Sequence, residues 1–266
     1  MKQLIHFLQN PFFKIVLSPL AFISFGLISG MGVNTQANWM GVILLYLISV
    51  SGQLVDHYYF VKYNHHLQAA APRIIWFVCE IVLLVASGLL ISQQHWIVSL
   101  LLIMYIAFIH LQYMPYNITQ TFSHFALSIF FNGYILNCIA YYSQTGLLNR
   151  RFLIALIPIV ILMGAIQFEI IQLKAKLMKV APPRWAIDNS LITFAISIVA
   201  LFFSLYLCLP SKSFFIIQLL HALLTGAAIL PLAIRTQRNK QNQNKLNYLH
   251  SVALIFTIMY ALSYIY

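Results

Sequence analysis

The sequence predicts an all-α polytopic membrane protein with about nine transmembrane helices, and three observations support this fold class. Of the 266 residues, 62% are hydrophobic and 7% are charged, whereas a soluble domain carries about 25% charged residues. The apolar residues occur in runs of about twenty, the length of helix that spans a bilayer. Most lysines and arginines lie between these runs. We therefore expect a single transmembrane domain over residues 1–266 rather than a soluble core.

Proline, glycine and polar clusters mark where the helices end. In chain order, the expected helices cover residues 12–30, 38–56, 73–92, 96–113, 121–143, 151–173, 188–209, 213–235 and 246–265. The fourth and the eighth of them follow short polar links at Gln93–Gln94 and Pro210–Lys212. All four tryptophans lie near predicted helix ends, where indole rings favour the headgroup level. No small-x-small cleavage site closes the first apolar run, so we expect a retained helix rather than a signal peptide.

The basic residues predict the orientation. With the N-terminus in the cytoplasm, only Arg150, Arg151 and Lys212 of the 15 lysines and arginines lie on the outer side. This is the positive-inside distribution of a plasma-membrane protein, and it supports an odd number of helices. Orientation and anionic lipid headgroups therefore explain the net charge of +11 better than nucleic acid does. The two most elaborate inner links, 57–72 and 174–187, are where we expect a cavity to open toward the cytoplasm.

The chain contains only four carboxylates, and all four fall in the cytoplasmic half of the predicted helices: Asp56, Glu80, Glu169 and Asp188. Ionisable groups within a membrane are costly and usually face a partner or a cavity. Asp188 precedes Asn189 and is explained as a helix N-cap. Asp56 could be solvated at a helix end. Glu80 and Glu169 lie deeper, where pairing with Lys174, with Arg73 or with a tyrosine hydroxyl is an alternative to a catalytic role.

A more specific pattern begins with the segment GQLVDHYYFVKY at 52–63. It aligns with an Asp-rich motif of the form NDxxDxxxD, and Asp56 occupies the position of the leading acid. Val55 stands in place of the asparagine, and Tyr59 and Tyr63 stand in place of the later acids.

Two further segments complete the pattern. The segment at 113–146 contains Tyr113, Pro115 and Gly133 and ends in YYSQTG at 141–146. The segment at 155–185 contains Pro158, Ala165–Ile166, Glu169 and Pro182, with Glu169 at the first acid of a second Asp-rich motif and Leu173 at the next. Together, the three segments resemble the UbiA superfamily of membrane prenyltransferases. Within it, they are most similar to the branch that prenylates dihydroxynaphthoate in menaquinone biosynthesis.

The resemblance implies a divergent transferase that moves an isoprenoid chain from a polyprenyl diphosphate to an aromatic quinone precursor. Such a reaction uses Mg²⁺, bound through carboxylates and phosphate oxygens, to stabilise the leaving diphosphate. Asp56 and Glu169 would then be the catalytic and Mg²⁺-binding residues, with too few acids for two ions. The diphosphate would be bound by cations of the inner face, namely Lys62, Arg73, Lys174, Lys176 and Arg184.

The sequence is also compatible with two other functions. A catalytically inactive relative would keep the cavity and bind an isoprenoid or quinone-like lipid, or a protein partner, with its acids turned away or paired with lysines. A small-molecule transporter would use the same charges as a pathway and would show inverted repeats with helices broken at mid-membrane. The transferase requires Asp56 and Glu169 to converge on one ion.

Overall fold

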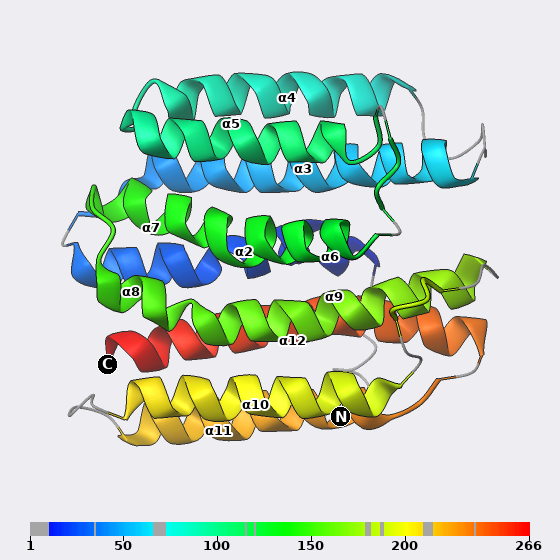
Figure 1. Cartoon of the computed structure of the whole chain (residues 1–266). Coiled ribbons are helices and arrows are strands. Elements are labelled where there is room, and N and C mark those ends of the chain that lie inside the picture. The colour runs from blue at the N-terminus through cyan, green and yellow to red at the C-terminus, as the bar shows by residue number, and fades with distance from the viewer. Residues whose placement is uncertain are drawn as a thin grey trace.

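The computed structural model describes residues 11–34, 36–65, 73–114, 116–119, 121–178, 182–186, 189–209, 215–236 and 238–266. Within these ranges all regular structure is helical, and nine helical rods run alternately in opposite directions along one bundle (Figure 1). The predicted all-α class is confirmed.

Each rod corresponds to one predicted segment, in the same order. The rods are α2 (Pro11–Val33), α3 (Trp39–His65), α4 (Arg73–Ile91), α5 (Trp96–Leu111), α6–η1–α7 (Phe122–Ile129, Phe130–Ile135, Leu136–Thr145), α8–α9 (Arg150–Ala155, Ile157–Met178), α10 (Ser190–Cys208), α11–η2 (Phe215–Ile229, Leu230–Ala233) and α12 (Asn239–Ile265). Seven of the rods are long and apolar enough to cross a membrane, and the apolar helices Leu17–Val33 and Trp96–Leu111 are shorter. These helices indicate a multi-pass membrane protein.

Three rods extend at least five residues further than predicted, and all three do so at the same end of the bundle. Helix α3 continues to His65, α9 continues to Met178, and α12 already begins at Asn239. Asp56, expected as the last residue of its helix, therefore lies in the interior of α3. The extension of α3 is held by aromatic packing, since Tyr58 stacks on Trp76 of α4 with ring centroids 5.4 Å apart. The predicted link 57–72 is thus helical over its first half.

Two rods are interrupted rather than straight. The rod predicted at 151–173 breaks after Ala155, because Pro158 has no backbone N–H to donate to the preceding turn. The rod predicted at 121–143 contains the π-helical turn η1 at Phe130–Ile135. Such turns occur frequently at functional sites. Here Asn137 stabilises the turn by donating to the Gly133 carbonyl oxygen, with 3.0 Å between the two atoms.

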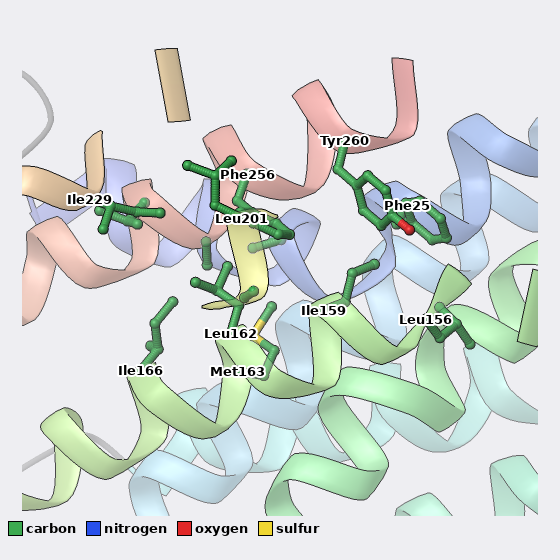
Figure 2. Close-up of a cluster of buried hydrophobic side chains, with 14 of the residues drawn as sticks. Phe25, Leu156, Ile159, Leu162, Met163, Ile166, Leu201, Ile229, Phe256 and Tyr260 are labelled. Atoms are coloured by element: carbon green, nitrogen blue, oxygen red, sulfur yellow. The ribbon is translucent and has the colours of Figure 1, made fainter. Parts of the chain in front are cut away.

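The bundle is layered (Figure 1). Helices α3, α4 and α5 form one side, α10 and α11 form the other, and α2, α6–α7, α9 and α12 lie between them. One hydrophobic cluster joins α2, α8–α9 and α12 to α10 and α11, and Figure 2 shows its side chains converging from these helices. In this cluster, Phe25 of α2 stacks on Tyr260 of α12 at 4.8 Å between ring centroids. A second cluster packs α3, α4 and α5 against the middle helices.

Helices α2 and α7 pack closely because α2 presents glycine at the contact. A Cβ atom added at Gly26 would lie 2.2 Å from the Asn137 carbonyl oxygen, and one added at Gly30 would lie 2.7 Å from Cβ of Gln144. The Gly26 backbone N–H also donates to the Asn137 side-chain oxygen at 3.0 Å. The Gly-x-x-x-Gly pair in the sequence therefore forms a helix contact within the chain.

The variant Gly26→Ala is expected to destabilise the protein by about 1–3 kcal/mol, because its methyl group overpacks the contact with α7. Thermal unfolding in detergent, followed by fluorescence-detected size exclusion, measures the change. The matched control is Gly88→Ala in α4, where an added Cβ has no neighbour within 4 Å. Equal transition temperatures for the two variants would contradict the close α2–α7 contact.

Candidate functional site

A cavity of about 650 Å³ lies at the end of the bundle where α3, α9 and α12 extend. It is lined by residues of α2, α3, α5, α6, η1, α9 and α12 and of the links that contain Tyr113 and Pro183. Its volume is within the range of about 300–1,000 Å³ that small-molecule and cofactor sites occupy. Apolar and aromatic side chains form much of its wall, with Phe22 contributed by α2 and Phe108 by α5.

Asp56 lines this cavity from α3, on the same helix face as Gly52 and Phe60. Its Oδ1 atom accepts hydrogen bonds from the Gln112 side-chain amide and from the Tyr113 hydroxyl, the latter at 2.8 Å. Burial, followed by the charge of Asp56, raises the pKa of the Tyr113 hydroxyl well above its ordinary value. Tyr113 therefore stays protonated and acts as a donor. Asp56 is thus oriented by two donors from the link after α5.

Lys174 faces the cavity from α9, across from α3. Its ammonium nitrogen lies 4.4 Å from the centroid of the Phe60 ring, one turn along α3 from Asp56. A cation over an aromatic face is stabilised by the ring quadrupole, more so when it is shielded from water. Among the described lining residues, Asp56 is the carboxylate and Lys174 the ammonium group. The cavity therefore combines apolar walls with one carboxylate, one ammonium group and three histidines, namely His57, His124 and His250.

Glu169 does not line the cavity with Asp56. It is 3% exposed and lies off the α9 face formed by Gln167, Ile170 and Lys174. Its Oε1 atom forms an ion pair with the Lys245 ammonium group of α12 at 2.7 Å, and its Oε2 atom accepts from the Thr193 hydroxyl of α10 at 2.8 Å. Glu169 was predicted about one turn from the inner end of its helix and instead lies nine residues before the end of α9.

The ammonium group of Lys245 is also fully engaged. It donates to the carbonyl oxygen of Leu232 at 3.1 Å and to that of Ile234 at 2.8 Å, at the end of η2. Lys245 was predicted as one of the loop charges that orient the chain, yet its side chain is buried. Nothing in the local sequence separates a buried lysine of this kind from a solvated one. The pairing depends on the meeting of α9 with α12.

The residues present do not fit the Mg²⁺ site that the family resemblance implies. Such a site needs carboxylate oxygens directed at one ion. Asp56 faces the cavity, whereas both oxygens of Glu169 are held by Lys245 and Thr193 outside the cavity lining. No group of three or more His, Cys, Asp or Glu side chains able to hold a metal occurs among the described residues.

Of the five cations predicted to bind a diphosphate, the structure brings Lys174 into the cavity lining and not the other four. Lys62, Arg73 and Arg184 are exposed at the same end of the bundle, and Lys176 is half-buried on α9. The Lys62 ammonium nitrogen lies 5.3 Å from the centroid of the Tyr63 ring. These four side chains are placed where they can contribute to the potential at the cavity mouth but not to its wall.

The residues at the other positions of the first motif do not line the cavity, unlike Asp56. Val55 is fully buried, and Tyr59 and Tyr63 follow it at successive turns. The rings of Tyr59 and Tyr63 lie 5.8 Å and 6.0 Å, between centroids, from the ring of Tyr113. Tyr59 also makes an edge contact with Trp76. At these positions the chain uses aromatic packing against α4 and the end of α5 where the family motif has carboxylates.

The YYSQTG segment lies at the opposite end of the bundle from the cavity. The Gln144 side chain accepts from the Asn38 backbone N–H at 2.9 Å and donates to the Asn38 carbonyl oxygen at 3.2 Å. Gly146 ends α7 in the left-handed conformation, with φ of 71°, which favours glycine. In this chain the segment therefore fastens the link between α2 and α3 to the end of α7.

The remaining acids have structural explanations or lie outside the described residues. Glu80 of α4 pairs with His110 of α5, with 2.5 Å between Oε1 and Nε2. Its partner is thus a histidine rather than the arginine or tyrosine considered from the sequence. Asp188 lies outside the described residues, as does Pro115. The N-cap of α10 is Asn189, whose side chain accepts from the Leu191 backbone N–H.

Three polar residues of the site carried no signal in the sequence. Gln112 contacts Asp56, and its side-chain oxygen faces the Nε2 atom of His124 at 2.8 Å. His250 of α12 also lines the cavity and is hydrogen-bonded through Nδ1 to Ser18 of α2 at 2.8 Å. A histidine within an apolar run is more often a core residue than a ligand contact, so only the fold distinguishes these side chains.

No protein-family model matches this sequence, and no curated protein is significantly similar to it. The prenyltransferase resemblance therefore rests on the three segments described above.

The variant Lys245→Met is expected to destabilise the protein by about 3–5 kcal/mol, because it leaves the Glu169 carboxylate buried without its counter-charge. Thermal unfolding in detergent measures the loss. Adding Glu169→Met to the same chain is expected to restore much of the stability, since both charges are then removed together.

The matched control for this pair is Lys240→Met, an exposed lysine on the same helix, with an expected change of under about 0.5 kcal/mol. If Lys245→Met and Lys240→Met had equal effects, Glu169 would not depend on Lys245, and its assignment to a structural role would fail.

Proposed function

We propose that this protein binds an isoprenoid or quinone-like lipid, with the headgroup between Asp56 and Lys174 and the isoprenoid chain against the apolar wall. The observation that carries the proposal is the cavity itself. It has apolar and aromatic walls, and it is lined by one carboxylate, Asp56, and one ammonium group, Lys174. A cavity with mostly apolar walls and a few charged groups matches an amphipathic ligand. In such a site most of the ligand surface is buried in apolar contact, and a few polar groups fix its orientation.

The charge balance of the cavity favours a neutral headgroup over a diphosphate. A diphosphate carries several negative charges, and binding it needs cations or Mg²⁺ to offset them. Here a single ammonium group lines the wall, and Asp56 would repel a phosphate brought beside it. A quinone-type ring has oxygen atoms that can accept from Lys174 without adding charge. This supports a lipid with an aromatic, uncharged headgroup.

Prenyl transfer in the manner of the UbiA superfamily is the second candidate. One observation favours it, namely that the leading acid of the first motif, Asp56, lines the cavity. The pairing of Glu169 with Lys245 disfavours it, because a metal-dependent transfer would lack its second carboxylate. The two candidates share the cavity and the class of ligand, and they differ in whether a covalent bond is formed.

We further propose that the protein lies in the plasma membrane of a bacterial cell with the cavity end toward the cytoplasm. Among the described residues, the cavity end of the bundle carries Lys62, Arg73, Lys174, Lys176, Arg184, Arg235, Arg238, Lys240 and Lys245. The opposite end carries Arg150 and Arg151 (Figure 1). The positive-inside rule then supports a cytoplasmic opening.

Lipid binding is tested with a tritiated naphthoquinone that bears a geranylgeranyl chain, added to the purified protein in nanodiscs. We expect saturable binding that EDTA does not change, because the proposed site uses no metal. Lys174→Met is expected to weaken binding about tenfold, the loss of one hydrogen bond from a charged donor.

Lys62→Met is the matched control, since Lys62 is exposed and does not line the cavity, and its affinity should equal that of the native chain. Uptake no greater than that of empty nanodiscs would refute the proposal. A separate incubation with labelled polyprenyl diphosphate and dihydroxynaphthoate, with Mg²⁺ or with EDTA, tests transfer. If a Mg²⁺-dependent product forms and is absent in Asp56→Asn, the function is prenyl transfer rather than binding alone.

A further inference from the structure

The Tyr105 hydroxyl of α5 is a polar group of the cavity for which the fold provides no partner. Tyr105 lines the cavity and is 3% exposed. Hydrogen bonds to protein groups are formed by the other hydroxyls of the described lining residues, namely those of Tyr113, Thr119 and Ser128. The Tyr105 hydroxyl forms none within the described part of the chain. It can therefore form a hydrogen bond with a ligand without losing one inside the protein.

This hydroxyl also keeps accessible surface. Some polar side-chain atoms of the described residues have neither a hydrogen-bond partner nor accessible surface, and Gln53 Nε2 and His124 Nδ1 are examples. The Tyr105 hydroxyl is not one of these atoms. Since it has no partner, it must retain accessible surface, although almost all of the side chain is covered.

Gly52 of α3 explains why the hydroxyl is uncovered on the cavity side. A Cβ atom added at Gly52 would lie 3.1 Å from the Tyr105 hydroxyl oxygen and 3.0 Å from Cδ1 of Ile109. All three residues line the cavity. The hydroxyl thus meets α3 at a point of the cavity wall where α3 has no side chain to cover it, and a ligand in the cavity can reach the oxygen atom there.

The Tyr105 hydroxyl and the Lys174 ammonium group lie at different depths of the cavity. The ammonium nitrogen is 4.4 Å from the centroid of the Phe60 ring, whereas the hydroxyl lies beside Gly52. Gly52 precedes Phe60 by eight residues (60 − 52), which corresponds to about 12 Å along α3. A six-membered ring with oxygen atoms in para positions and a hydrogen bond at each oxygen spans about 11 Å. One such ring can therefore contact both groups.

We propose that the Tyr105 hydroxyl is a second binding group for the lipid headgroup and donates to its inner oxygen, while Lys174 donates to the outer oxygen. The inference rests on the proposed function and narrows the ligand to rings with two oxygen atoms in para positions, as in a 1,4-quinone. A ring with a single oxygen would be held by Lys174, because a charged donor forms the stronger hydrogen bond. Tyr105 would then stay without a partner, and its contribution to affinity would be lost.

The test compares two ligands on the protein in nanodiscs, a 1,4-naphthoquinone with a geranylgeranyl chain and a 1-methoxynaphthalene with the same chain. Each displaces the tritiated naphthoquinone, and the affinity of each is measured. Tyr105→Phe removes the hydroxyl and keeps the ring. We expect this variant to bind the quinone about fivefold more weakly, the loss of one hydrogen bond from a neutral donor. Its affinity for the methoxy compound should stay within about twofold of the native value, because that ligand has no second oxygen.

Two further variants bear on the same contact. Gly52→Ala places a methyl group beside the hydroxyl oxygen and should weaken quinone binding to a similar extent with the tyrosine in place. Its matched control is Gly88→Ala, where an added Cβ has no neighbour within 4 Å. The matched control for Tyr105→Phe is Tyr206→Phe, the same chemical change at an exposed tyrosine outside the cavity lining. Both controls should bind the quinone like the native chain.

Two other measurements separate a ligand contact from a structural role. Without ligand, Tyr105→Phe should unfold at a temperature no lower than that of the native protein, because the hydroxyl has no partner in the described part of the chain. With quinone labelled with ¹³C at both carbonyl groups, two hydrogen-bonded carbonyl bands are expected in the infrared spectrum of the native complex. In Tyr105→Phe, one of the two should return to the frequency of a carbonyl group without a hydrogen bond.

The outcomes separate this inference from the proposed function. If the native protein and Tyr105→Phe bind the quinone equally, lipid binding stands and the role of Tyr105 is refuted. The role of Tyr105 is also refuted if the variant loses affinity for both ligands alike or unfolds at a lower temperature, since the hydroxyl would then serve the fold. If the labelled naphthoquinone does not bind to the native protein, the proposed function fails and this inference fails with it.

Discussion

The ion pair between Glu169 and Lys245 is the contact on which the arrangement of this protein depends. Each charge is buried in a medium of low polarity, where an isolated ion would be strongly unfavourable. The Thr193 hydroxyl and two carbonyl oxygens at the end of η2 satisfy the remaining positions of the pair. The pair thereby joins α9, α10, α11–η2 and α12 at one level of the bundle. It also explains why α9 contributes a base to the cavity and keeps its only acid outside.

The same requirement for paired charges shapes the polar side of the cavity. Asp56 can lie in an apolar wall because Gln112 and Tyr113 both donate to it. Gln112 can only donate to Asp56 by turning its oxygen toward His124. One carboxylate therefore orders a series of neighbours up to a histidine at the first turn of α6. A buried polar network rigidifies its surroundings and specifies a single arrangement to the extent that its members are satisfied.

The sequence predicted the rods well and the contacts between them poorly. All nine helical segments can be predicted from the length of the apolar runs and from the proline, glycine and polar clusters that separate them. The clustering of lysine and arginine at one end of the bundle can be predicted from their positions between the apolar runs. These signals are local, so no tertiary information is needed to interpret them. The partners of the acids are not local. Glu169 meets Lys245 across 76 residues of chain (245 − 169), and Glu80 meets His110 only because α4 and α5 are antiparallel neighbours. The extension of α3 was missed because its polar and aromatic residues resemble a link until Trp76 and Tyr113 pack against them.

The aromatic residues of α3 give the strongest reason to separate binding from transfer. The face of α3 formed by Val55, Tyr59 and Tyr63 is committed to packing against α4 and the end of α5. A carboxylate at position 59 or 63 would therefore have to be buried among these rings at considerable cost, or the helix would have to be repacked. Restoring the acids one at a time would thus destabilise the chain before it could rebuild an ion site. The same aromatic face supports the extended part of α3, which carries Phe60 and, with it, the ring beneath the Lys174 ammonium group. In this chain the polar wall of the cavity depends on aromatic packing at positions where the family motif has acids, and this dependence is the reason that we propose binding without a metal.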